Sequence, residues 1–225
     1  MLSPASCGVI FDLDGVLVNS TEEHFRSFER LGKEAGYTIT REQFRGLFGR
    51  HNDDIFPILF GHPLPAEELA RLANHKEAIF REMLYGNVTP LPGVHALLSS
   101  LHNVGFHLAL GTSTPRANVD LIFDALGLID LFEVIVSAED VTRGKPDPQV
   151  FLLAAERIGI SPTRCVVVED AIAGVYAAKN GGMLALAVTT NHTHEALTMA
   201  QADYVVDSLA EVSPMDFIAL LSQRG

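Results

Sequence analysis

The chain has 225 residues, of which 48% are hydrophobic, and its formal net charge is −12, with 28 acidic and 16 basic residues. That is enough apolar material for a sizeable core, and the lack of a basic excess argues against nucleic acids and anionic membranes as partners. No apolar run reaches the roughly 18 residues of a membrane span, and the first residues do not resemble a signal peptide. Both cysteines, Cys7 and Cys165, lie in apolar runs, so we predict reduced thiols in a cytoplasmic protein.

The first predicted element is a buried strand that leads into the sequence DLDG. Its apolar residues are followed by Asp12 and Asp14, two carboxylates one residue apart, and then by Gly15. Such neighbours repel one another and lose hydration unless a metal or a catalytic task compensates. Because side chains alternate along a strand, both carboxylates point the same way and can address one substrate.

The next stretch, residues 19–91, contains only helical patterns. An S-x-x-E spacing that starts at Ser20 and a T-x-x-Q spacing that starts at Thr40 are capping boxes, and they predict two helix starts. Residues 65–84 are typical of a long helix with its charges on one face. We therefore predict an all-helical domain inserted after the first strand.

Strands and helices alternate in the rest of the chain. The strands are short, nearly continuous apolar runs, predicted at residues 106–112, 132–138, 164–170, 183–189 and 204–208. This alternation predicts a parallel sheet covered by helices on both faces. The predicted fold class is α/β: a Rossmann-like parallel-sheet domain (residues 1–18 and 92–225) with an inserted all-helical domain (residues 19–91).

Polar residues follow four of the predicted strands. In an open parallel sheet the functional crevice lies beyond the carboxyl ends of the strands, so these segments meet at one edge. They are Asp12–Gly15, Gly111–Thr114, Arg143–Asp147 and Glu169–Asp170. Clustered carboxylates suit Mg²⁺, and a lysine with hydroxyl and backbone donors suits a phosphoryl group. A nucleotide-binding P-loop is excluded, because the chain has no GxxxxGK[ST] sequence.

These four segments resemble the signature motifs of the haloacid dehalogenase superfamily of phosphohydrolases and phosphomutases. The matching sequences are DLDGV, GTST, GKPDP and VVVEDAIAGV, in the family's order and over essentially the whole chain. The helical insert resembles the small cap domain of the β-phosphoglucomutase-like branch. Taken singly, each residue could be a helix cap, a turn hydroxyl or a surface charge, but together and in order they favour catalysis.

The resemblance implies a catalytic role for several residues. Asp12 would be the nucleophile that forms an aspartyl-phosphate, and Asp14 the general acid and base. The Thr112 hydroxyl and the Ser113 amide would bind phosphoryl oxygens, and Lys145 would balance the negative charge.

The resemblance also implies Mg²⁺ as the cofactor. Its ligands would be Asp12, the Asp14 carbonyl and Asp170, with Glu169 as a direct or water-mediated ligand. The metal and the lysine would make the paired carboxylates tolerable.

Asp14 argues against two other branches of the superfamily. True haloacid dehalogenases lack this second aspartate. Phosphonatases place alanine there and use a cap lysine, for which Lys33 and Lys76 are the residues available in the insert. The enzymes that remain are phosphatases and mutases of phosphate esters.

The choice between a phosphatase and a mutase depends on the insert. His24, Phe28 and Lys76 match the mutase pattern, but that family holds a distal phosphate with an arginine after a glycine-containing loop. Asn52 falls at that position and Arg50 lies two residues earlier. Without a firm second phosphate contact a bisphosphate intermediate is hard to retain. We therefore predict a phosphatase for a small phosphorylated metabolite, with a sugar phosphate as the expected substrate and a hexose-phosphate mutase as the alternative.

Four residues of the insert, His24, Arg50, Asn52 and Lys76, are predicted to contact the substrate. A non-catalytic phospho-acceptor or binding protein is a further alternative, since receiver domains use a similar Asp, Thr and Lys set. Those domains place the acceptor on a middle strand, so the first-strand position of Asp12 argues against them. We expect a monomer or a weak dimer.

Overall fold

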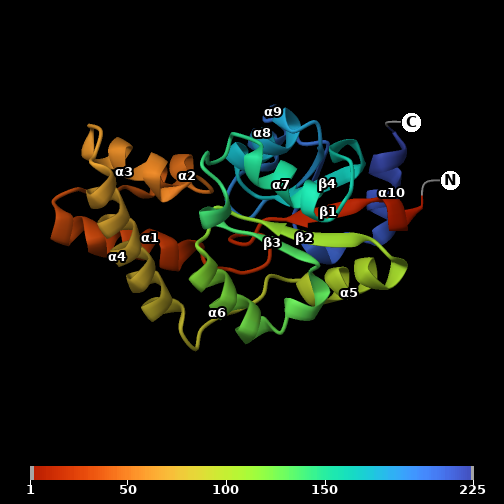
Figure 1. The fold of residues 1–225 in the computed structure, drawn as a ribbon, viewed down its shortest axis with the longest axis horizontal. Helices are drawn as coiled ribbons and strands as arrows, with labels where there is room; N and C mark the ends of the chain where they lie inside the picture. Colours follow the sequence, from red (N-terminus) through yellow and green to blue (C-terminus); the bar gives the residue numbers. More distant parts are fainter. Residues whose placement is uncertain (1–2, 224–225) are drawn as a thin grey trace.

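Six parallel strands form the central sheet of the computed structural model, which describes residues 3–223 (Figure 1). They are β1 (Gly8–Phe11), β2 (His107–Gly111), β3 (Val134–Val136), β4 (Cys165–Glu169), β5 (Leu184–Val188) and β6 (Tyr204–Val206). Their order is β3-β2-β1-β4-β5-β6, so the first strand lies in the middle. Phe11 lies beside Leu110 of β2 and Val168 of β4, which brings the residues after these strands to one edge of the sheet.

Helices cover both faces of the sheet. One layer contains α5 (Val94–Val104), α6 (Arg116–Leu126) and α10 (Pro214–Ser222), and the other contains α7 (Gln149–Arg157), α8 (Ile172–Asn180) and α9 (His194–Met199). On β1, Val9 and Phe11 pack into the first core and Ile10 into the second, as alternation along a strand requires. The short 3-10 helices are η1 (Pro4–Ser6), η2 (Ile129–Leu131), η3 (Ala138–Asp140), η4 (Pro162–Arg164) and η5 (Leu209–Glu211).

The inserted domain lies beyond one end of the sheet (Figure 1). It consists of α1 (Thr21–Ala35), α2 (Arg41–Leu47), α3 (Asn52–Phe60) and α4 (Ala66–Leu84), and residues 21–84, all of which are described, contain no strand. Its core is rich in aromatic rings, with 5.5 Å between the ring centroids of Phe25 and Phe44 and 5.8 Å between those of Phe28 and Phe56. The predicted fold class is confirmed, while the domain boundaries stay a prediction.

One of the two predicted capping boxes is wrong. Thr40 caps α2 as expected: its Oγ1 accepts from the Gln43 backbone N–H at 3.2 Å, and Gln43 Oε1 accepts from the Thr40 N–H at 2.9 Å. Ser20 precedes α1 but makes no capping hydrogen bond. It is buried, and its hydroxyl donates to Asp14 Oδ1 at 2.5 Å instead. A charged acceptor within reach has displaced the ordinary cap.

The five strands predicted after the insert are all present, each shorter than its apolar run by one residue or more at its ends. Two helices, α3 and α5, had no prediction. For α5 the signal was readable, because Val94, Leu97, Leu98 and Leu101 recur at helical spacing and are all buried. Among the described helices, none is both long and apolar enough to cross a lipid bilayer.

Candidate active site

Three carboxylates meet at the carboxyl ends of β1 and β4. Asp12 follows β1, Glu169 ends β4 and Asp170 comes next, and one oxygen of each lies within 4.8 Å of the others. Lys145 reaches them from the loop before α7, with its Nζ 2.9 Å from Asp12 Oδ1 and 2.7 Å from Glu169 Oε1. All four side chains are buried. One ammonium group therefore faces three carboxylates.

The pKa values of this cluster are strongly perturbed. Burial raises the pKa of Asp12 to about 7; Lys145 opposes this shift and Glu169 adds to it. Burial and the neighbouring carboxylates raise the pKa of Asp170 well above its usual value. Burial opposes the charge of Lys145, but Asp12 and Glu169 outweigh it and raise the lysine pKa. Three carboxyl groups thus share one ammonium group, and the raised pKa values of Asp12 and Asp170 show that their ionised forms need a further cation nearby.

The free oxygen atoms show where a hard cation fits. Oδ1 of Asp170 is buried and accepts no hydrogen bond from the described residues. Glu169 is more fully engaged: Oε1 accepts from Lys145, and Oε2 accepts from the backbone N–H groups of Asp170 and Ala171, each at 2.9 Å. The donor set offered by Asp12 and Asp170 is the kind that Mg²⁺ prefers, and Glu169 anchors the lysine and the turn after β4.

Gly15 lets the segments after β1 and β4 come together. Its φ is +78°, a conformation that favours glycine, and a Cβ there would lie 2.1 Å from Asp170 Oδ2. No larger residue fits without moving a carboxylate of the cluster.

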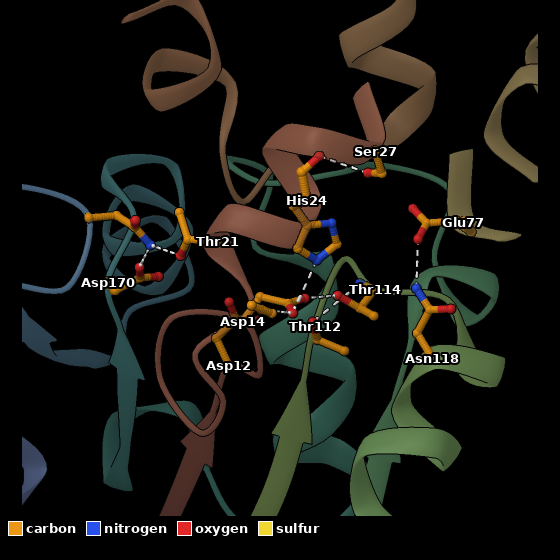
Figure 2. Close-up of polar contacts among 12 residues, drawn as sticks. Asp12, Asp14, Thr21, His24, Ser27, Glu77, Thr112, Thr114, Asn118 and Asp170 are labelled. Carbon is orange, nitrogen blue, oxygen red and sulfur yellow. Dashed lines mark hydrogen bonds and ion pairs between the residues drawn. The ribbon is translucent and has the colours of Figure 1, made fainter. Parts of the chain in front are cut away.

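Asp14 lies in a different environment from Asp12. Three donors surround its carboxylate: the Ser20 hydroxyl at 2.5 Å, His24 Nε2 at 3.1 Å and the Thr114 hydroxyl (Figure 2). Burial alone would raise the pKa of Asp14, but His24 and the two hydroxyls outweigh it and hold the pKa well below its usual value. The pKa values of Asp12 and Asp14, which are separated by one residue, are therefore shifted in opposite directions.

The segment after β2 supplies hydroxyl and amide groups beside these carboxylates. Thr112 is buried, and its Oγ1 accepts from the Thr114 backbone N–H at 3.2 Å. The Ser113 hydroxyl donates to the Gly49 carbonyl at 2.9 Å, which links this segment to the inserted domain. The predicted phosphoryl-binding residues thus lie where the two domains meet.

A buried lysine of α4 orients His24. Lys76 Nζ lies 2.7 Å from His24 Nδ1 and 2.8 Å from Glu77 Oε1. An ammonium group can only donate, so Nδ1 accepts and the imidazole proton lies on Nε2, which faces Asp14. The rings of Phe28 and Phe80 lie 4.8 and 5.3 Å from the same Nζ. These contacts surround the Lys76 ammonium group.

Glu77 ties the insert to the sheet domain. Its Oε1 accepts from Asn52 Nδ2 at 2.7 Å. Its Oε2 accepts from Asn118 Nδ2 of α6 at 2.6 Å (Figure 2). Arg81 donates to Asn118 Oδ1 at 2.8 Å. Burial opposes the charge of Glu77, but Lys76 outweighs it and lowers the carboxyl pKa.

A cavity of about 40 Å³ lies between the two domains at this point. It is lined by Asp12, Asp14, His24, Phe28, Phe44, Phe48, Gly49, Arg50, Asn52, Ile55, Lys76, Glu77, Thr112, Ser113 and Thr114. Every residue predicted from the sequence to bind substrate is among them. Lys145, Glu169 and Asp170 lie in the adjoining acidic cluster. Arg50 is half-buried, and its Nε has no hydrogen-bond partner among the described residues.

Sequence reasoning missed four residues of this site. Ser20 was predicted to cap a helix and not to contact Asp14, and Thr114 lies inside the GTST motif but had no predicted role. Glu77 and Asn118 gave no signal, because a single polar residue on a helix normally belongs to its solvated face.

Comparison with known proteins agrees with this geometry. Residues 9–188 match the family model described as haloacid dehalogenase-like hydrolase. The chain is 32% identical over 211 residues to the validoxylamine A 7'-phosphate phosphatase of Streptomyces hygroscopicus subsp. limoneus, covering 90% of this chain and 94% of that protein. It is 33% identical over 215 residues to the β-phosphoglucomutase of Bacillus subtilis, covering 91% of each.

A solved structure shares the whole architecture. CbbY from Rhodobacter sphaeroides, in complex with phosphate, superposes with a TM-score of 0.83 at 26% identity, covering 97% of this chain and all of that one. The match extends over both the sheet domain and the inserted helices. The chain belongs to the haloacid dehalogenase-like hydrolase family.

Proposed function

We propose that the protein is a phosphatase that cleaves a small phosphorylated metabolite, with a sugar phosphate as the expected class. The observation that carries this proposal is geometric: Asp12, beside Lys145, and Asp14, beside His24, line one cavity. A carboxylate beside an ammonium group can act as a nucleophile, and a second carboxyl group that faces the same cavity can exchange a proton with the leaving oxygen or with water. Related proteins named phosphorylated carbohydrates phosphatase and fructose-1-phosphate phosphatase support the same class.

We propose Mg²⁺ as the cofactor. Asp12, Asp170 and the backbone carbonyl of Asp14 would hold the ion, and Glu169 would act through a water, because its own oxygens are already engaged. When bound, the ion would neutralise charge on the phosphoryl oxygens and on the attacking carboxylate.

The side chains would divide the reaction into two displacements. Asp12 attacks phosphorus and the bond to the leaving oxygen breaks, while Asp14, which must enter this step in its protonated form, gives that oxygen a proton. Water then attacks the phosphoryl-aspartate, Asp14 takes a proton from it, and inorganic phosphate and Asp12 are released. Thr112, the Ser113 amide and Lys145 stabilise the phosphoryl charge. The inserted domain excludes bulk water from the cavity.

A hexose-phosphate mutase is the second candidate. Arg50, with its buried and unpartnered Nε, gives the insert one cation that is free to hold a second phosphate. The contacts of Lys76 favour the phosphatase, because Glu77 already neutralises the only other cation in the cavity lining. Whether Lys76 touches the substrate stays a prediction.

The test follows phosphorus directly. We would incubate the protein with Mg²⁺, sugar phosphates including β-glucose 1-phosphate, and a trace of glucose 1,6-bisphosphate, and follow the reaction by phosphorus NMR. Free phosphate should appear and should be lost in Asp12→Asn, whereas the exposed control Asp130→Asn should keep full activity. Movement of phosphate from position 1 to position 6 without release would establish the mutase instead.

A cytoplasmic location is also proposed. Both cysteines are buried and unpaired, which supports a reducing compartment. The expectation of a monomer or weak dimer stays a prediction.

A further inference from the structure

We infer that Glu77 determines the substrate class, so that the part of the substrate beyond its phosphoryl group is uncharged and bears hydroxyls, while a second anionic group is rejected. This inference rests on the proposed phosphatase function. It concerns the end of the cavity formed by the inserted domain, opposite the acidic cluster.

The first support is the position of Glu77. Its carboxylate is only 5% exposed, yet the residue lines the same cavity as Asp12 and Asp14. Its carboxylate pairs with Lys76 at 2.8 Å, so the pair leaves no net positive charge at this end of the cavity to attract a phosphate or carboxylate group.

The second support is the orientation of Asn52. A carboxylate can only accept hydrogen bonds, so Asn52 must present its amide N–H to Glu77, at 2.7 Å. The Asn52 carbonyl oxygen has no hydrogen-bond donor among the described residues. Asn52 lines the cavity and retains this oxygen and its second amide N–H as free hydrogen-bonding groups. A hydroxyl can both donate and accept, so it matches this uncharged pair of groups.

The third support is the enclosure of Lys76. Its ammonium group is 2% exposed and lies against Glu77, His24 and two aromatic rings. The cation nearest to this end of the cavity is therefore already paired. Arg50 lines the same cavity, but it also lines a groove together with Lys145 that does not include Glu77, so it is not confined to the Glu77 end.

A second cavity that shares two lining residues with the first indicates where the rest of the substrate would extend. Asn52 and Glu77 also form part of the wall of a neighbouring cavity of about 280 Å³, which is larger than the 40 Å³ catalytic cavity. A group that leaves the phosphoryl site in this direction passes both side chains. These two side chains then contact the part of the substrate that follows the phosphoryl group.

The experiment compares substrates that differ by one group. Sorbitol 6-phosphate and 6-phosphogluconate differ only in a hydroxymethyl against a carboxylate, as do glycerol 3-phosphate and 3-phosphoglycerate. Phosphate release from each would give the ratio of kcat/KM within a pair, with acetyl phosphate as a reference that has no distal group. Wild-type protein should prefer the hydroxyl member of at least one pair by ten-fold or more, and Glu77→Gln should reduce that preference by ten-fold or more.

Two further variants test whether the charge at the Asn52–Glu77 contact is what changes the substrate preference. Asn52→Lys leaves the buried carboxylate in place and adds a cation at the half-buried end of the contact, so it should shift the preference in the same direction. Glu67→Gln removes the same charge from the exposed face of α4 and should leave the ratios unchanged.

The experiment distinguishes a failure of this inference from a failure of the proposed phosphatase function. Equal use of both members by the wild type, or ratios that Glu77→Gln and Asn52→Lys leave unchanged, would overturn this inference while phosphatase activity remains. Absence of phosphate release from all of these substrates, acetyl phosphate included, would overturn the proposed function itself.

Discussion

The two ends of the cavity are built on opposite electrostatic principles. At the sheet end, Asp12, Glu169 and Asp170 share a single lysine, and two of the three carboxyl pKa values are raised. At the helical end, Glu77 is matched by Lys76 and by two amides, and its pKa is lowered.

This difference indicates that the sheet end of the cavity carries out the reaction and that the helical end selects the substrate. An excess of buried negative charge is costly unless a cation compensates for it, so the sheet end is prepared for metal and phosphoryl binding. A satisfied ion pair has little remaining capacity for an anion, so the helical end is prepared for a neutral group. Asp14 lies between the two ends and receives donors from both domains: Thr114 from the sheet domain, and Ser20 and His24 from the start of the insert.

Removing the lysine of the sheet end should have the largest effect. Lys145→Met leaves the carboxylates without an ammonium partner among the described residues, so we expect kcat to fall by about 10³-fold and the free energy of unfolding to fall by about 3 kcal/mol. Phosphate release and urea unfolding measure the two effects. Lys179→Met is the matched control, because that lysine pairs with Asp203 at 2.6 Å nearer the surface and should change both quantities little. Equal effects of the two variants would contradict the special role of the cluster.

Metal binding should depend on pH in a defined direction. Folding raises the pKa of Asp12 to about 7, so the metal-free folded state retains a proton there that the unfolded chain releases near pH 4. This contribution to stability is present at low pH and is lost as the pH rises from about 4 through 7. Asp14, whose pKa is lowered, acts in the opposite sense, and its contribution is lost only as the pH falls below about 4.

Because Mg²⁺ needs the ionised Asp12, its affinity should rise over that window by up to about ten-fold per pH unit. The increase in Tm on replacing EDTA with Mg²⁺ should be small at pH 5 and larger at pH 8. Asp12→Asn should remove most of this increase. A Mg²⁺ effect of the same size at both pH values would contradict a cation site at Asp12.

The sheet end of the site could be predicted from the sequence, and the helical end only in part. Strand ends place DLDG and VVVED at one edge because parallel pairing leaves few alternatives, so Asp12 and Asp170 were expected to meet. Helices offer no such constraint. Which face of α4 turns inward depends on packing against α1 and α6, and Glu77 and Asn118 become partners only through that packing.

Ser20 and Thr40 show most clearly that a sequence spacing does not fix the role of a residue, since both begin the same capping spacing yet act differently. Thr40→Ala should lower the free energy of unfolding by about 1 kcal/mol and leave kcat unchanged, because its hydroxyl serves only the start of α2. Ser20→Ala removes a hydrogen bond to the Asp14 carboxylate, so kcat should fall by about ten-fold or more, with recovery in Ser20→Thr. Urea unfolding and phosphate release on the same preparations separate the two roles. If Ser20→Ala instead lost stability alone, as Thr40→Ala is expected to do, its hydroxyl would be structural and the orientation of Asp14 would depend on His24 and Thr114.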